Sequence, residues 1–96
     1  MDPAAHEAFL HGVRLRLTPK EFGVLLELAK AAGNPVPAKD LYESVWGEPF
    51  DHSAANSVMV HVRRLREKLA EADPSEEVVA TVWGVGYRIE TGKGGR

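Results

Sequence analysis

The chain has 96 residues, a formal net charge of -2 and no cysteine. This length allows one hydrophobic core, and no apolar run reaches the roughly 20 residues that span a bilayer, so we expect one domain without a membrane segment. The absence of cysteine excludes disulfides and thiolate metal sites and favours a cytoplasmic protein, while the acidic balance argues against polyanion binding over the whole surface.

The N-terminal part predicts a β-hairpin. Apolar and basic residues alternate from 13 to 17, which is the period-two pattern of a half-buried strand. Phe9 and Leu10 precede a turn-like His11-Gly12 pair. We therefore expect residues 8–17 to form two short antiparallel strands.

A capping signature marks the start of the first helix. Thr18 suits the N-cap, Pro19 suits the first helical position, and Glu21 stands where a capping box is completed. An apolar stripe at helical spacing follows over 22–29, and Gly-Asn-Pro at 33–35 ends the pattern.

Two further helices follow. The second is expected from about Ala38 to Val45, and residues 46–51 break its pattern and predict a loop. The third is expected from Ser53 or Ala54 to just before Asp73-Pro74. We interpret Ser53 as its cap and not as a nucleophile, because no histidine and acid accompany it.

The C-terminal part predicts a second hairpin. Residues 78–83 and 87–89 are rich in strand formers and flank a glycine-containing turn, whereas 91–96 are polar, glycine-rich and expected to be disordered. Strands, three helices and a hairpin predict an α+β winged helix-turn-helix domain over 1–90, with a three-helix core, N-terminal antiparallel strands and a C-terminal hairpin wing. In helix-turn-helix proteins the second helix of the motif enters the DNA major groove.

The third helix, about 54–72, is amphipathic. At about 100° per residue, a narrow arc faces the core and holds Val58, Val62, Leu65 and Leu69. The opposite arc holds Asn56, Val60, Arg63, Arg64 and Glu67. One flank holds Met59 and Arg66, and the other holds Ser57, His61 and Lys68.

Two interpretations of the outer arc are open. Arginine can bind guanine or a phosphate, asparagine can pair with adenine, and an outward valine can contact a thymine methyl, so the face suits DNA reading. The same basic run also fits a solvated helix surface on which Arg63 pairs with Glu67.

Four segments together resemble the effector domain of OmpR/PhoB-type bacterial response regulators. They are LTPKEFGVLLELA (17–29), LYESVWG (41–47), NSVMVHVRRLREKL (56–69) and TVWGVGYRIE (81–90). They occur in the family's order and spacing, and the resemblance covers about residues 8–90.

The resemblance implies an output domain of a two-component transcriptional regulator that binds double-stranded promoter DNA sequence-specifically. The third helix would lie in the major groove, and the wing on the adjacent backbone or minor groove. It also implies a head-to-tail pair on direct repeats and contact with RNA polymerase. A receiver domain is expected in the full-length protein, and we interpret this sequence as an excised output domain.

Position by position, the resemblance implies four groups of site residues. The base-reading candidates are Asn56, Val60, Arg63 and Arg64. The candidates that it gives for phosphate or backbone contacts are Trp46, Ser57, His61, Arg66, Thr81 and Tyr87, and the flank position of Lys68 on the helix makes it a further phosphate candidate. The wing tip contains Trp83, Gly84 and Gly86. The loop that corresponds to the polymerase-contacting segment contains Gly47, Glu48, Pro49, Phe50, Asp51 and His52.

Some residues depart from the family pattern. Met59 stands where aspartate is usual, and Trp83 replaces an arginine that many relatives insert into the minor groove. For Trp83 we expect packing or stacking on a sugar, and for Trp46 an indole N–H donated to a phosphate, with simple packing as the alternative. Gly84 and Gly86 are expected to serve the backbone geometry of the wing turn.

The acidic net charge and the missing wing arginine support an alternative function, a winged-helix module that binds a protein instead of DNA. We expect no enzyme, catalytic residue or cofactor. The four histidines lack ligand spacing, so no metal site is expected, and Gly84-Val85-Gly86 lacks the following glycine and helix of a nucleotide loop.

Overall fold

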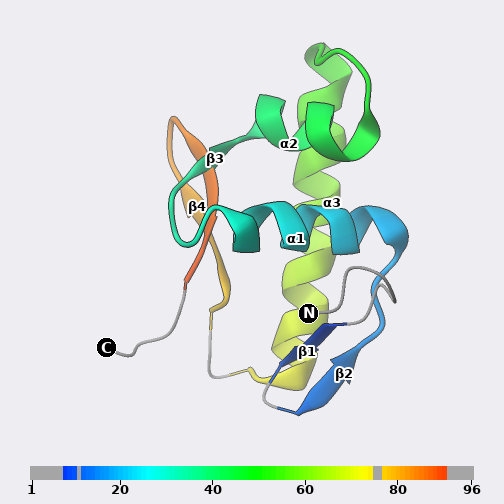
Figure 1. Ribbon diagram of the computed structural model, residues 1–96, viewed down its shortest axis with the longest axis vertical. Coiled ribbons are helices and arrows are strands. Elements are labelled where there is room, and N and C mark those ends of the chain that lie inside the picture. The colour runs from blue at the N-terminus through cyan, green and yellow to red at the C-terminus, as the bar shows by residue number, and fades with distance from the viewer. Residues whose placement is uncertain (1–7, 11, 75–76, 91–96) are drawn as a thin grey trace.

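The computed structural model describes residues 8–10, 12–74 and 77–90 (Figure 1). In chain order the elements are β1 (Ala8–Leu10), β2 (Val13–Leu15), α1 (Pro19–Lys30), β3 (Val36–Pro37), α2 (Ala38–Trp46), α3 (His52–Ala72), β4 (Val79–Val82) and β5 (Gly86–Ile89). The predicted α+β winged helix-turn-helix architecture is confirmed. The predicted disorder of 91–96 lies outside the described residues.

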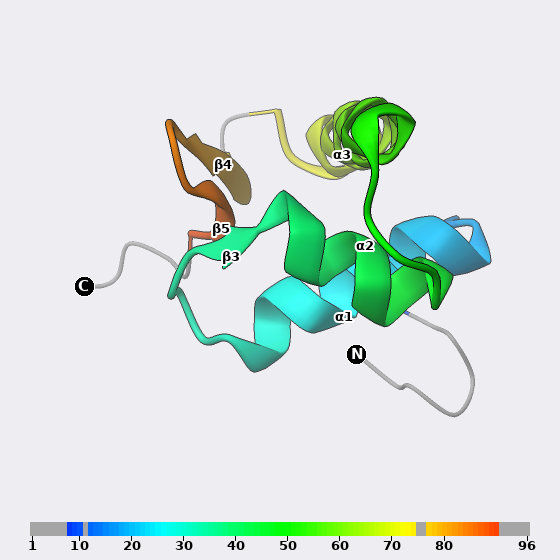
Figure 2. The same cartoon turned by 90° about the horizontal axis from the view of Figure 1, so that it is seen from above.

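The three helices form two layers. In Figure 1, α3 runs along the longest dimension of the molecule, and α1 and α2 cross it. In Figure 2, α3 and the β4–β5 hairpin stand on one side of the molecule, opposite α1. None of the helices in the described part of the chain combines the length and apolar character that a membrane crossing needs.

The strands form two antiparallel sheets. β1 pairs with β2, and the second sheet has the order β3-β5-β4. The sequence patterns did not predict β3, because two residues before a helix show no periodicity. β3 pairs with β5 through Val36 opposite Tyr87 and Pro37 opposite Gly86, so the wing is the outer part of a three-stranded sheet.

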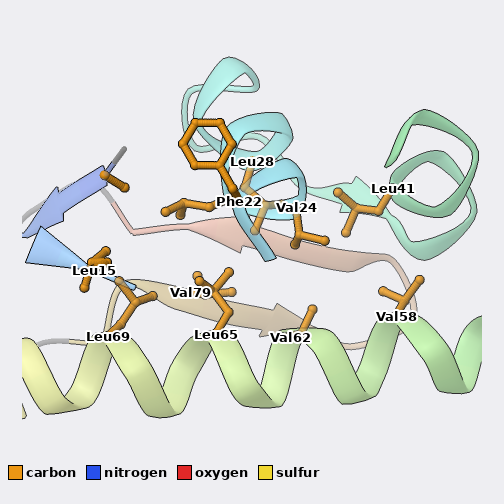
Figure 3. Packing of buried hydrophobic residues seen from close by; sticks show 12 residues of the cluster. Leu15, Phe22, Val24, Leu28, Leu41, Val58, Val62, Leu65, Leu69 and Val79 are labelled. Atoms are coloured by element: carbon orange, nitrogen blue, oxygen red, sulfur yellow. The ribbon is translucent and has the colours of Figure 1, made fainter. Parts of the chain in front are cut away.

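The core lies between α3 and the other elements. The predicted inner arc of α3 is confirmed, since its four residues are at most 3% exposed. They face α1, α2 and the two sheets, as the labelled side chains of Figure 3 show. Burial of each such side chain stabilises the fold by about 1.5–3 kcal/mol, and this fixes the rotation of α3 about its axis.

The predicted capping box of α1 is present. The Glu21 backbone N–H donates to Thr18 Oγ1 at 3.2 Å, and the Thr18 N–H donates to Glu21 Oε1 at 3.0 Å. Two N–H groups that the helix leaves without intrahelical acceptors are thereby bonded.

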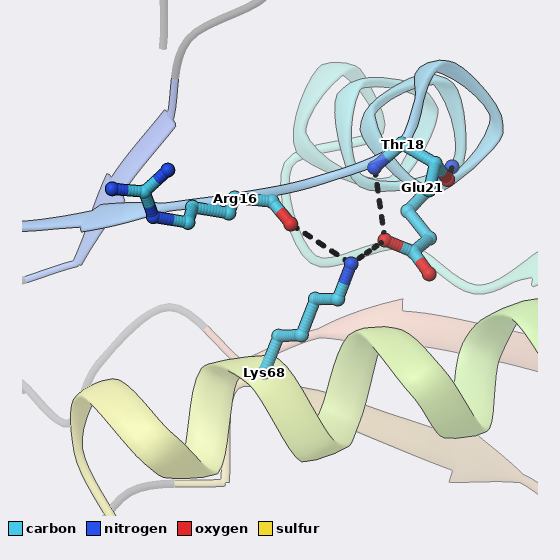
Figure 4. A network of polar contacts seen from close by, with 4 residues as sticks. All are labelled: Arg16, Thr18, Glu21 and Lys68. Atoms are coloured by element: carbon cyan, nitrogen blue, oxygen red, sulfur yellow. Dashed lines mark hydrogen bonds and ion pairs between the residues drawn. The ribbon is translucent and has the colours of Figure 1, made fainter.

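The same Glu21 carboxylate forms an ion pair with α3 (Figure 4). Lys68 Nζ lies 2.6 Å from Glu21 Oε1, whose side chain is 2% exposed, and also donates to the Arg16 carbonyl oxygen at 2.8 Å. Burial raises the pKa of the Glu21 carboxyl, but hydrogen bonds from Lys68 and the Thr18 N–H outweigh it, so the pKa lies below its ordinary 4.5. The structure thus engages Lys68 inside the fold, and the phosphate contact expected from its flank position stays a prediction.

The N-cap of α3 is Asp51 and not Ser53, so that prediction was wrong. The Asp51 carboxylate accepts the Ala54 N–H at 3.0 Å and the Ser53 hydroxyl at 3.0 Å. The hydrogen bond from the Ser53 hydroxyl has the largest effect, followed by the one from the Ala54 N–H, and both hold the pKa of the Asp51 carboxyl below its usual value. A carboxylate is favoured at this position because it also faces the positive end of the helix dipole.

Gly86 is required by the close approach of β3. A Cβ at Gly86 would lie 2.0 Å from the Val36 carbonyl oxygen and 2.7 Å from Pro37 Cα.

We expect Gly86→Ala to lower the free energy of unfolding by about 1–3 kcal/mol, because β3 would have to move away from β5. Gly84→Ala is the control, since its cost is only the left-handed backbone, about 1 kcal/mol. Urea denaturation measures both, and an equal or smaller cost at Gly86 would contradict this explanation.

The ion pair predicts an acid-dependent stability. Glu21→Gln should lower the free energy of unfolding at pH 7 by about 1–2 kcal/mol, because Lys68 loses its charged partner. Since the folded pKa of Glu21 is below 4.5, the wild type should lose this stabilisation as the pH falls from 4.5 through the folded pKa. The difference between wild type and variant should therefore shrink between pH 7 and pH 3 in urea titrations.

Glu71→Gln is the matched control, because Glu71 is exposed on α3 and forms no ion pair within the described residues. It should leave stability within about 0.5 kcal/mol of wild type at both pH values. A Glu21→Gln deficit of the same size at pH 3 and pH 7 would show that the charge of Glu21 does not contribute.

Candidate nucleic-acid interface

The outer face of α3 exposes two arginines. Arg63, Arg64 and Asn56 are exposed, and Val60, between them on the helix, is half-buried. Within the described residues neither guanidinium forms a hydrogen bond or an ion pair, so the expected alternative pair between Arg63 and Glu67 is not formed. Both positive charges are therefore available to an external anion or acceptor.

Trp46 and His61 meet where α2 packs on α3. The Trp46 ring stacks on Tyr42 with centroids 5.0 Å apart, and the His61 ring meets its face edge-on at 4.9 Å. The indole N–H donates to no acceptor in the described part of the chain. Packing therefore orients Trp46 and leaves its N–H free, so the packing and phosphate-binding interpretations are compatible.

The His61 ring is oriented by its own helix. Its Nδ1 lies 2.8 Å from the Ser57 carbonyl oxygen, one turn earlier. Because a carbonyl oxygen only accepts, Nδ1 carries the hydrogen, and Nε2 remains for another partner. Ser57 and His61, which the resemblance places at the DNA backbone, thus lie on the α2 side of the outer face.

Arg66 lies on the opposite flank and contacts the wing. Its Nε donates to the Val79 carbonyl oxygen at 3.1 Å, and its Nη2 donates to Thr81 Oγ1 at 2.5 Å. The guanidinium carbon is 5.9 Å from the centre of the Tyr87 ring. Three predicted backbone-contacting residues, Arg66, Thr81 and Tyr87, are thus brought together between α3 and the wing.

The wing tip exposes an aromatic side chain. Trp83 is 89% exposed and Val85 is 49% exposed, so the prediction that Trp83 packs against the protein was wrong. Stacking of Trp83 on a sugar stays a prediction. Of the two turn glycines, Gly84 has the positive φ of 80° that the turn needs, whereas Gly86 is explained by its contact with β3.

The loop before α3 is exposed, and Phe50 holds it against α2 through two contacts. Gly47 ends α2 in the left-handed conformation, with φ of 74°. The Phe50 N–H donates to Glu43 Oε2 at 3.3 Å, and the Phe50 ring meets Tyr42 edge-on at 5.9 Å. His52, which the sequence placed in this loop, is the first residue of α3.

Lys20 is a residue of this region that the sequence analysis missed. Its Nζ donates to the Val45 carbonyl oxygen near the end of α2 and lies 5.5 Å from the Trp46 ring centre. The two residues are 25 positions apart, so only the packing of α1 on α2 reveals the contact. Within the described residues there is no cluster of three or more histidine, cysteine or acidic side chains that could hold a metal ion.

A protein family described as "Transcriptional regulatory protein, C terminal" matches residues 12–89. Regulatory protein VanRc of Enterococcus gallinarum is 45% identical over 87 residues, which are 90% of this chain and 37% of that protein. Regulatory protein VanR of Enterococcus faecium is 40% identical over 85 residues, with 88% and 37% coverage.

A solved structure has the same fold as this chain. The RstA DNA-binding domain of Klebsiella pneumoniae, in complex with the RstA box, superimposes with a TM-score of 0.78 at 31% identity, over 92% of this chain and 86% of that one. The chain spans little more than a third of the length of the curated relatives. It belongs to the family of transcriptional regulatory protein C-terminal domains, the effector domains of OmpR/PhoB-type response regulators.

Proposed function

We propose that this domain binds double-stranded promoter DNA sequence-specifically, as the output domain of a bacterial two-component transcriptional regulator. The observation that supports this most directly is the outer face of α3, where Arg63 and Arg64 are exposed and unpaired within the described residues. The K. pneumoniae RstA domain, which shares the fold, was solved in complex with its RstA box. The domain is not an enzyme.

α3 is the element that enters the major groove. With 21 residues it is about 31 Å long, and its outer face presents one continuous surface to a duplex. Arg63 and Arg64 can each donate a forked pair of hydrogen bonds to guanine O6 and N7, Asn56 can pair with adenine, and Val60 can contact a thymine methyl. These four residues are the proposed base readers.

Backbone contacts border this face on both sides. Toward α2, the free indole N–H of Trp46, the Ser57 hydroxyl and the His61 ring are the proposed phosphate ligands. Toward the wing, Thr81 and Tyr87 are the proposed contacts to the adjacent backbone. Phosphate contacts on both flanks would fix the register of α3 in the groove without reading sequence.

The wing tip is proposed to contact the adjacent backbone or minor groove through Trp83. An indole carries no charge, so its contact with a sugar would come from apolar and stacking interactions. This contribution should depend little on salt, unlike that of the α3 arginines.

Several partners extend the proposal beyond this domain. Two copies would bind head-to-tail on direct repeats, and the exposed loop of residues 47–51, with His52 at the start of α3, would contact RNA polymerase. The matched relatives are much longer than this chain, which supports a receiver domain in the full-length protein. Promoter binding would place this domain in the cytoplasm.

A protein-binding module is the second candidate function. It is favoured by the net charge of -2 and by the exposed apolar tip formed by Trp83 and Val85. Such a module would bind a protein partner with little salt dependence and would not be retained on heparin or duplex DNA.

Selection of bound duplexes from a random library, followed by fluorescence anisotropy, tests the proposal. The logarithm of the wild-type affinity should fall linearly with the logarithm of salt concentration, with a slope of about -0.9 per phosphate contact. Combined Arg63→Glu and Arg64→Glu substitutions should weaken binding of the selected duplex about 100-fold or more, because two base contacts are lost.

Combined Lys30→Glu and Lys39→Glu substitutions are the matched control. They change the net charge equally, but at exposed positions on α1 and α2. The control should stay close to wild type on the selected duplex. If the Arg63/Arg64 variant bound the selected duplex with wild-type affinity, α3 would not be the DNA-reading helix. If both variants lost affinity equally, the interaction would be explained by general charge attraction alone.

A further inference from the structure

Arg66 is the residue through which α3 contacts the wing by side-chain hydrogen bonds. Of the other α3 side chains in the described part of the chain, Lys68 bonds toward β2 and α1, and His61 bonds within its own helix. Among the described α3 side chains, only Arg66 donates to the C-terminal sheet. Its flank of α3 is the one that faces β4 and β5.

The guanidinium contacts both strands of the wing at one level. Thr81 on β4 is the register partner of Tyr87 on β5. Arg66 donates to the hydroxyl of Thr81 and lies over the ring of Tyr87, while its Nε donates to the Val79 carbonyl oxygen two residues earlier. A planar fork can make these contacts together, whereas a lysine ammonium cannot.

These contacts lie two residues before the exposed turn residue of the wing. Beyond Thr81 the strands continue for one further pair, Val82 with Gly86, before the turn. The turn residue Trp83 is 89% exposed, so its side chain makes little contact with the protein. A strand rises about 3.3 Å per residue, so Trp83 lies about 7 Å beyond Thr81, and a tilt at the base displaces it.

The other anchors of the sheet hold it from other sides, and β3 does so at the same level, since it pairs with β5 at Tyr87 and Gly86. Val79 is buried in the core, and β3 pairs with β5 beside α2. Arg66 adds a contact from α3 itself, which bears on the angle between the wing and the outer face of α3. That angle decides whether one duplex can accept α3 in its major groove and the wing on its adjacent backbone.

We infer that Arg66 is a positioning residue for DNA binding, which holds the wing at the angle that lets α3 and the wing contact one duplex together. This inference rests on the proposed function. It gives Arg66 a role different from the phosphate contact that the resemblance implies, since two of its five donors are used within the protein.

The test uses Arg66→Met and Arg66→Lys on two probes: the duplex recovered by selection, and the same duplex shortened by the base pairs that the wing protects from hydroxyl radicals. Arg66→Met should weaken binding of the full duplex about tenfold and abolish protection at the wing segment, with helix protection retained. On the shortened duplex, Arg66→Met and wild type should bind equally.

Arg66→Lys separates positioning from phosphate binding. A positioning role predicts that it behaves like Arg66→Met, because the charge is kept and the fork is lost. A phosphate contact predicts near wild-type affinity and salt slope with unchanged wing protection, and this result would overturn the inference while leaving the proposed function intact.

Thr81→Val keeps the test valid if an Arg66 variant fails to fold. It removes the hydroxyl that accepts from Arg66 and that is also a proposed backbone contact, so its combination with Arg66→Met is the deciding measurement. Thr81→Val alone should likewise reduce wing protection and weaken binding of the full duplex. Combined with Arg66→Met it should add little further loss, since both remove the same contact. Additive losses would overturn the inference.

Arg63→Met is the matched control on the outer face. It should weaken binding of both duplexes, because α3 contacts both. If Arg63→Met bound both duplexes like wild type, the proposed function itself would fail, an outcome distinct from failure of the Arg66 inference.

Discussion

Burial of one arc of α3 is the constraint that fixes the placement of this helix, and the ion pair between Glu21 and Lys68 reinforces it. A buried carboxylate is tolerated only when its oxygens are paired, and here one oxygen accepts both the Thr18 N–H and Lys68 Nζ. Lys68 also bonds the Arg16 carbonyl oxygen, so the β2–α1 junction and α3 are tied at one point. Together with the buried arc, this contact allows only one rotation of α3, and that rotation turns Arg63 and Arg64 outward.

Four basic residues within six positions of α3 therefore have three different environments. Lys68 neutralises a buried carboxylate, Arg66 bonds the wing, and Arg63 and Arg64 remain unpaired within the described residues. The net charge of the chain is a poor guide to such a surface. What matters for an approaching polyanion is that the unpaired charges share one face, which favours a single orientation of docking.

Local patterns predicted most of the fold. The capping box at Thr18 and the inner arc of α3 depend on neighbours within one or two helical turns, so they can be read from sequence. β3 could not, because its pairing depends on how closely its backbone approaches Gly86. The same holds for Lys68, whose partner Glu21 is 47 residues away, and for the exposure of Trp83, which strand-forming patterns do not determine.

The wing shows why the candidate site cannot be reduced to its positive charges. An arginine at the tip would be attracted to phosphates over a range of orientations, whereas an indole gains energy only in close contact. A tip with Trp83 therefore needs a wing that is already held at the correct angle. The fork of Arg66 on Thr81, across from Tyr87, supplies such a constraint at the base of the hairpin. Under the proposed function, the absence of a charge at the tip and the use of Arg66 within the protein would be two parts of one arrangement, in which shape replaces charge as the means of engaging the adjacent backbone.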